Sequence, residues 1–213
     1  MRKAVATALA VILILTLASC SFEANTPEYL ARRAYSETSS LTEATVYYEA
    51  HMTVKRTHMT GARYDEVSLT KKCVWTDDAY TVYRADGEVA ETNDSGVFAW
   101  EFIFPAISTD GYEVVESSMS RTELVREAIL ILSTKELVGY FSERVSELLA
   151  VYGASHADLT GAGDTTFTLT VDRPRGYART AIVHFSTTVT IGNEVCPATF
   201  SFRFDYTDVN YEV

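Results

Sequence analysis

Long stretches in which apolar and polar residues alternate one by one dominate this chain. The cleanest stretch lies near the C-terminus, where the alternate positions on one side are aromatic: Phe200, Phe202, Phe204 and Tyr206. Because successive side chains of a strand point to opposite faces, this pattern predicts a strand with one buried aromatic face. Similar alternation over 44–55, 167–171 and 181–191 predicts further half-buried strands. The fold must therefore contain a large antiparallel sheet.

Turn-forming dipeptides and a proline divide the alternating stretches into separate strands. Asp86-Gly87 and Gly192-Asn193 are typical of two-residue hairpin turns, because these residue types tolerate a positive φ. Pro105 ends one apolar stretch, since proline cannot donate to a strand ladder. Further strands are predicted over 64–75, 79–84, 97–104 and 112–116.

An N-terminal helix is indicated by Thr26 followed by Pro27. Threonine is a favourable N-cap residue, and proline is well tolerated at the first helical position, where its missing N–H costs nothing. The helix is expected to end at about Ser39.

Two more helices are predicted in the middle of the chain. Capping-box spacing occurs at 120–123 and again at 133–136, each time before an apolar stripe. The predicted helices reach Leu132 and Tyr152, and Gly153 stands where a left-handed residue ends the second one. One kinked helix is the alternative.

The order of these elements predicts an α+β fold. A helix, several antiparallel strands, two helices and a three-stranded meander follow one another along residues 27–213. We expect a single domain with one extended, curved, half-barrel-like antiparallel sheet and with helices packed on one of its faces.

The first twenty residues are organised as an export signal. Arg2 and Lys3 precede an apolar stretch over 4–17, which is too short for a membrane-spanning helix, and small residues lead to Cys20. An ordinary secretory signal cut at a nearby small residue is one interpretation of this pattern.

Leu17-Ala18-Ser19-Cys20 resembles the lipobox of bacterial lipoproteins. The resemblance implies that residues 1–19 are removed, that Cys20 becomes a lipidated N-terminus, and that 20–26 form a short tether. Two or three acyl chains would hold the protein stably at the extracytoplasmic face of the cell membrane, or at the outer membrane of a Gram-negative source. The sequence does not distinguish these membranes.

Charge excludes one class of partner. The chain has a net charge of −11, and loss of Arg2 and Lys3 with the signal makes it −13. Nucleic acid repels so acidic a surface, so nucleic-acid binding is not expected.

The remaining two cysteines form an even pair in an oxidising compartment. With Cys20 assigned to lipid, Cys73 and Cys196 either form a disulfide or stay as two buried thiols. A disulfide requires that their strands be neighbours.

No pattern in the chain indicates catalysis, a metal or a cofactor. His51 and His58 are an odd number of residues apart on one predicted strand, so they face opposite sides and cannot share a metal. His156 and Asp158 are expected in a solvated loop. Motifs for a nucleophile elbow, a zinc-dependent protease or a phosphate-binding loop do not occur. We therefore expect a protein that is not an enzyme.

The element order also resembles the LolA/LppX-like lipoprotein superfamily, through a helix after the anchor, long strands, a central helical insert and returning strands. This resemblance implies a carrier of lipids or lipoproteins in a half-open barrel lined by apolar side chains, and it transfers no site residue. Cones of the nuclear-transport-factor-like and cystatin-like kinds are a second fold candidate.

Five phenylalanines are the candidates for an apolar pocket: Phe167, Phe185, Phe200, Phe202 and Phe204. They either line a cavity for a lipid or another hydrophobic ligand, or they fill a core. The first alternative predicts a surface-anchored binding or carrier protein. The second predicts a structural or interaction lipoprotein of the cell envelope, whose protein partner the sequence does not name.

Overall fold

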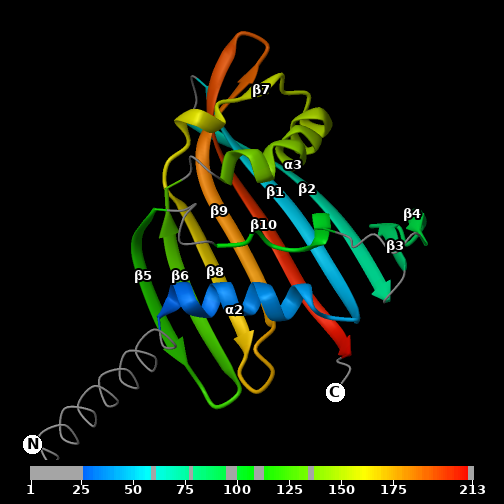
Figure 1. Cartoon of the computed structure of the whole chain (residues 1–213). Helices are drawn as coiled ribbons and strands as arrows, with labels where there is room; N and C mark the ends of the chain where they lie inside the picture. Colours follow the sequence, from blue (N-terminus) through cyan, green and yellow to red (C-terminus); the bar gives the residue numbers. More distant parts are fainter. Residues whose placement is uncertain are drawn as a thin grey trace, which may run out of the picture.

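The computed structural model of the chain describes residues 26–58, 61–76, 79–94, 100–107, 113–133 and 137–210. The predicted signal segment, Cys20 and the tether as far as residue 25 lie outside the described residues. The described residues form a ten-stranded sheet and two α-helices (Figure 1).

The strands pair antiparallel in the order β4-β3-β2-β1-β10-β9-β8-β6-β5, and β7 adds to β9. Their bounds are β1 Glu43–His58, β2 Gly61–Thr76, β3 Ala79–Arg84, β4 Val89–Asn93, β5 Val114–Arg121, β6 Val125–Leu132, β7 His156–Ala157, β8 Thr165–Asp172, β9 Ala178–Ile191 and β10 Glu194–Asn210. The sheet is open, since β4 and β5 do not pair with each other in the described part of the chain.

The central strands show why the alternating pattern predicts this sheet. In the β1–β10 register Tyr48 lies opposite Phe204 and Met52 lies opposite Phe200, and all four side chains are buried. Tyr47, the neighbour of Tyr48, points to the other face and is 43% exposed. Inward and outward positions follow the period of two that the sequence predicts.

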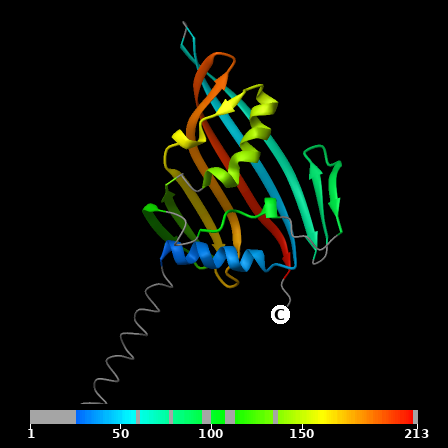
Figure 2. The same cartoon turned by 45° about the horizontal axis from the view of Figure 1, so that its top comes forward.

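Both helices lie on the same side of the curved sheet, where the buried face is (Figures 1 and 2). α2 (Pro27–Ser39) crosses one end of the strands, and α3 (Leu137–Tyr152) lies nearer the other end. The segment 100–107 runs across the sheet between them and begins with the 3₁₀ turn η1 (Trp100–Phe102). A second 3₁₀ turn, η2 (Leu159–Gly161), precedes β8.

The ends of the two helices follow the predicted signals. The Thr26 hydroxyl accepts the Tyr29 N–H at 3.2 Å, which makes Thr26 the N-cap of α2. α3 ends at Gly153, whose φ of +82° places it in the left-handed region and whose N–H donates to the Leu149 carbonyl at 2.8 Å. The capping box predicted at 133–136 falls mostly on 134–136, which lie outside the described residues.

The helix predicted over 120–132 is wrong, because these residues form the β5–β6 hairpin. Thr122 stabilises the turn between the two strands. Its N–H donates to the Val125 carbonyl at 2.9 Å, and its hydroxyl accepts the Val125 N–H at 3.3 Å. Along β6, Ala128 and Leu130 are buried and the intervening Ile129 is exposed. Apolar residues on both faces hide this alternation in the sequence.

The strand predicted over 97–104 is also wrong where the structure describes it. Residues 97–99 lie outside the described part, Trp100–Phe102 are a 3₁₀ turn, and the chain continues without regular structure. Phe102, Ile103 and Phe104 are all buried, although they are consecutive. The segment covers the sheet as a separate layer and does not join it.

The strand predicted over 112–116 is observed as β5, which starts at Val114 and extends to Arg121. Residue 112 lies outside the described part.

Thr38 ties the end of α2 to the start of β9, and this contact gives a test of the fold. Its hydroxyl donates to the Ala34 carbonyl at 2.6 Å and accepts the Ala178 N–H at 2.9 Å. Thr38→Val keeps the shape but leaves a buried N–H unpaired, so we expect the free energy of unfolding to fall by about 1–3 kcal/mol in urea denaturation. Ser40→Ala is the control, since its exposed hydroxyl bonds only the Glu37 carbonyl among the described residues. Equal stabilities of the two variants would contradict the proposed role of Thr38.

Candidate functional site

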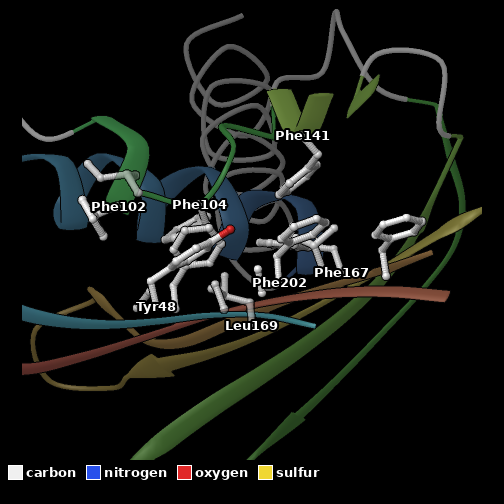
Figure 3. Packing of buried hydrophobic residues seen from close by; sticks show 14 of the residues in the cluster. Tyr48, Phe102, Phe104, Phe141, Phe167, Leu169 and Phe202 are labelled. Atoms are coloured by element: carbon white, nitrogen blue, oxygen red, sulfur yellow. The ribbon is translucent and has the colours of Figure 1, made fainter. Parts of the chain in front are cut away.

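The five phenylalanines of the predicted pocket form a packed aromatic layer. They lie on β8, β9 and β10, and each is at most 4% exposed. The Phe141 ring of α3 stacks on Phe202 with 4.6 Å between centroids, and Phe185 stacks on Phe200 at 5.4 Å. Phe104 packs on Phe167 at 5.8 Å, so the segment 100–107 covers the other part of the layer (Figure 3).

This packing favours the core alternative for the five residues. Four of the rings contact the covering elements, Phe200 stacks on Phe185, and none of the five lines the cleft described below. Leu124 and Ile129, which the predicted helix would have placed near them, are 65% and 36% exposed on the β5–β6 hairpin. A ligand placed against these rings would have to displace α3 or the segment 100–107.

A cleft of about 250 Å³ opens beside the aromatic layer, between β1, β2, η1 and α3. We call it the β1–α3 cleft. Its aromatic lining is Tyr48, Phe102 and Tyr140, and its charged lining is Lys71, Glu101, Glu143, Arg144 and Glu147. The cleft is therefore amphipathic, with rings and charges around one space.

Tyr48 brings an unsatisfied polar atom to this cleft. The residue points inward from β1, is 3% exposed, and packs between Phe204 and Phe102 at centroid distances of 5.2 and 6.1 Å. Its hydroxyl has no hydrogen-bond partner among the described residues. Burial raises the pKa of Tyr48 far above the ordinary value for tyrosine, although Arg144 partly opposes the shift, so the hydroxyl is neutral. A neutral hydroxyl can both donate and accept.

Tyr206 shows how the same face satisfies a comparable hydroxyl. Its oxygen donates to the Phe102 carbonyl at 3.1 Å and accepts the Phe104 N–H at 3.2 Å. Buried polar groups in proteins are generally paired in this way. The Tyr48 hydroxyl is an exception to this rule, because it is buried and has no hydrogen-bond partner among the described residues.

Arg144 holds the two covering elements together. Its guanidinium lies 4.7 Å from the Tyr140 ring centroid and 5.6 Å from those of Tyr48 and Phe204. It donates to the Tyr140 carbonyl at 3.2 Å and also to the Glu101 carbonyl. The cation thus links α3 to η1 and to the sheet.

The carboxylates of the cleft outnumber its cations. Lys71 on β2 is paired with Glu147 on α3 at 3.1 Å. The carboxylates of Glu101 and Glu143 form no ion pair with any described residue. Partial burial raises the pKa of Glu101, and the carboxylates of Glu91 and Glu147 add to the rise while Lys71 and Arg144 oppose it.

Sequence reasoning predicted the inward position of Tyr48 but not the cleft. The sequence does contain a pattern for the α3 side of the cleft. Four of its lining residues have the spacing of one helix face: Tyr140, Glu143, Arg144 and Glu147. Nothing in the sequence places this face against residues 48, 71 and 101.

Of the two alternatives for the cysteines, the structure has the second, because Cys73 and Cys196 are buried free thiols. β1 separates β2 from β10 in the sheet. Cys73 is paired with Val46, whereas Ala198, two residues from Cys196, is paired with Val54. At ~3.4 Å per residue the sulfurs are on the order of 30 Å apart, far beyond the ~7 Å between Cα atoms that a disulfide requires.

His51 and Asp158 make structural contacts. His51 has its ring nitrogens 2.8 and 3.1 Å from the hydroxyls of Ser68 and Thr53. Asp158 accepts the Gly161 N–H at 3.0 Å and caps η2. His156 is exposed but lies in the short strand β7, where the sequence predicts a loop, and His184 is also exposed. Within the described ranges no group of three or more His, Cys, Asp or Glu side chains could hold a metal.

Comparison with known proteins leaves the family of the chain open. No protein-family model matches it, and no curated protein matches it. A solved structure of the LolA superfamily protein NE2245 from Nitrosomonas europaea is similar over 88% of this chain and 94% of that chain, with 10% identity and a TM-score of 0.28. At that TM-score the likeness does not show membership. Neither helix of the described part combines the length and apolar composition needed to cross a membrane.

The thiols provide a test of the strand order. Burial raises the pKa of Cys73 to about 12 and also raises the pKa of Cys196, so both stay protonated at pH 8. In a Cys20→Ala protein we expect slow alkylation by iodoacetamide in the native state and two adducts after unfolding without reductant, measured by mass spectrometry. A sample that gains adducts only after reduction would contradict the separation of the two strands.

Proposed function

We propose that the chain is a binding protein without catalytic chemistry, that lipid on Cys20 anchors it at the extracytoplasmic face of a bacterial membrane, and that its ligand is amphipathic. The observation that carries the ligand proposal is the β1–α3 cleft. There an aromatic wall, a charged wall and a buried hydroxyl without a described partner surround one cavity of about 250 Å³.

The size and position of the cleft support a ligand that enters with its polar head. Pockets that enclose whole drug-sized ligands usually span ~300–1,000 Å³, so a cavity of about 250 Å³ suits a head group and a few adjoining carbons. Tyr48, Phe102 and Tyr140 offer apolar surface to those carbons. The packed phenylalanine layer beside them need not open.

A filled core also supports the second candidate, a structural or interaction lipoprotein that acts through protein contacts. The observation that favours it is the close packing of Phe141 on Phe202 and of Phe185 on Phe200. The two candidates differ in whether the cleft binds an amphiphile.

Filling the cleft tests the binding proposal. Glu143 is an exposed cleft residue of α3, and Glu143→Trp would place a large ring there without removing a core contact. With octylamine, octanoate and octyltrimethylammonium as single-chain probes, we expect isothermal titration calorimetry to show saturable one-to-one binding of at least one probe to the unmodified sequence. We expect Glu143→Trp to abolish that binding.

Val151→Trp is the matched control, since Val151 lies on the same helix, is 62% exposed and does not line the cleft. It should bind like the unmodified sequence. If none of the three probes binds, the binding proposal fails and the interaction lipoprotein becomes the better account.

Anchoring has its own test in the bacterial host. Cys20 is the only residue to which the lipobox resemblance assigns lipid, so Cys20→Ala should leave uncleaved precursor or release the protein into the medium. Fractionation followed by immunoblotting measures both results. Normal processing and membrane retention of Cys20→Ala would contradict the proposed anchor.

A further inference from the structure

The charges of the β1–α3 cleft are unevenly satisfied. Lys71 and Glu147 neutralise each other, and Arg144 is bound by two backbone carbonyls and by aromatic rings. The carboxylates of Glu101 and Glu143 form no ion pair with any described residue, although the charges of Lys71 and Arg144 partly offset that of Glu101. A bound group would therefore meet excess negative charge.

The Tyr48 hydroxyl adds an acceptor at the buried side of the same space. Tyr48 rises from β1 toward the layer that Phe102, Phe104 and Phe141 form above the sheet (Figure 3). Its side chain lines the cleft, is almost fully buried, and its hydroxyl lacks a partner among the described residues. A ligand that donates a hydrogen bond to this oxygen would remove the cost of leaving it unpaired.

We infer that the β1–α3 cleft recognises a primary ammonium group as the head of its ligand, held by Glu101, Glu143 and the Tyr48 hydroxyl. This inference rests on the proposed function and names the chemical class of its ligand. An ammonium group carries one positive charge and three N–H donors, which match two carboxylates and one hydroxyl acceptor.

Other head groups fit these residues less well. An anion would lie beside Glu101 and Glu143, and the two cations of the cleft are already engaged. Lys71 is paired with Glu147, and Arg144 donates to two backbone carbonyls. A quaternary ammonium has no N–H for the hydroxyl or the carboxylates. The aromatic faces that favour such a group are already shared with the guanidinium of Arg144, which lies 4.7 Å from the Tyr140 centroid and 5.6 Å from the Tyr48 centroid.

Three probes with the same eight-carbon chain separate these possibilities. Octylamine is protonated at pH 7, octanoate is its anionic counterpart, and octyltrimethylammonium has the charge without N–H donors. In calorimetry we expect octylamine to bind at least about tenfold more tightly than either of the others, because its hydrogen bonds join charged partners.

Tyr48→Phe isolates the hydroxyl. The variant removes one oxygen that makes no hydrogen bond in the described structure, so the fold should be retained, as circular dichroism and thermal unfolding would verify. We expect it to weaken octylamine binding by about tenfold and to leave octyltrimethylammonium binding unchanged. Tyr47→Phe is the matched control, since Tyr47 lies on the opposite face of β1, and it should change neither affinity.

Glu101→Gln and Glu143→Gln test the carboxylates. Each should reduce the preference for octylamine over octanoate, and the double variant should abolish it, whereas Glu116→Gln on the exposed strand β5 should not.

Equal affinities for octylamine and octanoate would overturn the ammonium inference and leave the binding proposal standing. Octylamine binding that Tyr48→Phe does not change, or octyltrimethylammonium binding as tight as octylamine, would also overturn it. If no probe binds, the binding proposal itself fails.

Discussion

Removing the aromatic face of β10 from water is the requirement on which the rest of this structure depends. Phe200, Phe202, Phe204 and Tyr206 alternate along the strand and are all buried. Burying one such side chain contributes about 1.5–3 kcal/mol, so this strand must lie in the middle of the sheet and under a cover. β1 and β9 pair with it on either side and add Tyr48 and Phe185 to the same face.

The cover is made of two different elements, and the β1–α3 cleft lies where they meet. Phe141 of α3 packs on Phe202, while Phe102 and Phe104 come from the segment 100–107. Arg144 bonds the Glu101 carbonyl, and the Tyr140 hydroxyl bonds the Ile103 carbonyl. Backbone groups of one element are thus satisfied by side chains of the other. The Tyr206 hydroxyl also bonds to the backbone of the segment 100–107, whereas the Tyr48 hydroxyl has no partner among the described residues.

Local patterns predicted the elements well where one face was clearly polar. The strands of the C-terminal meander and β1 show strict alternation, and the Thr26 cap and Gly153 marked real helix ends. Prediction was wrong for β6, where Ile129 and Ile131 are apolar on the outward face and imitate a helical stripe. Ser120, the first residue of the predicted capping box, lies within β5 instead of capping a helix. Both errors have one cause, since apolar residues and hydroxyl caps serve either structure.

The sequence by itself determined which residues face inward along β1 and β10, because the period of two follows from the geometry of one chain. It also gives the net charge of −11 and predicts an export signal. Only the tertiary structure decided that β1 lies between β2 and β10, which separates Cys73 from Cys196 and leaves them as two thiols. It also decided that residues 48, 71, 101 and 144 surround one cleft. Many strand orders, and many placements of the helices and of the segment 100–107, would bury the same strand faces. The arrangement that forms depends on packing between segments distant in the chain, and no local pattern contains that information.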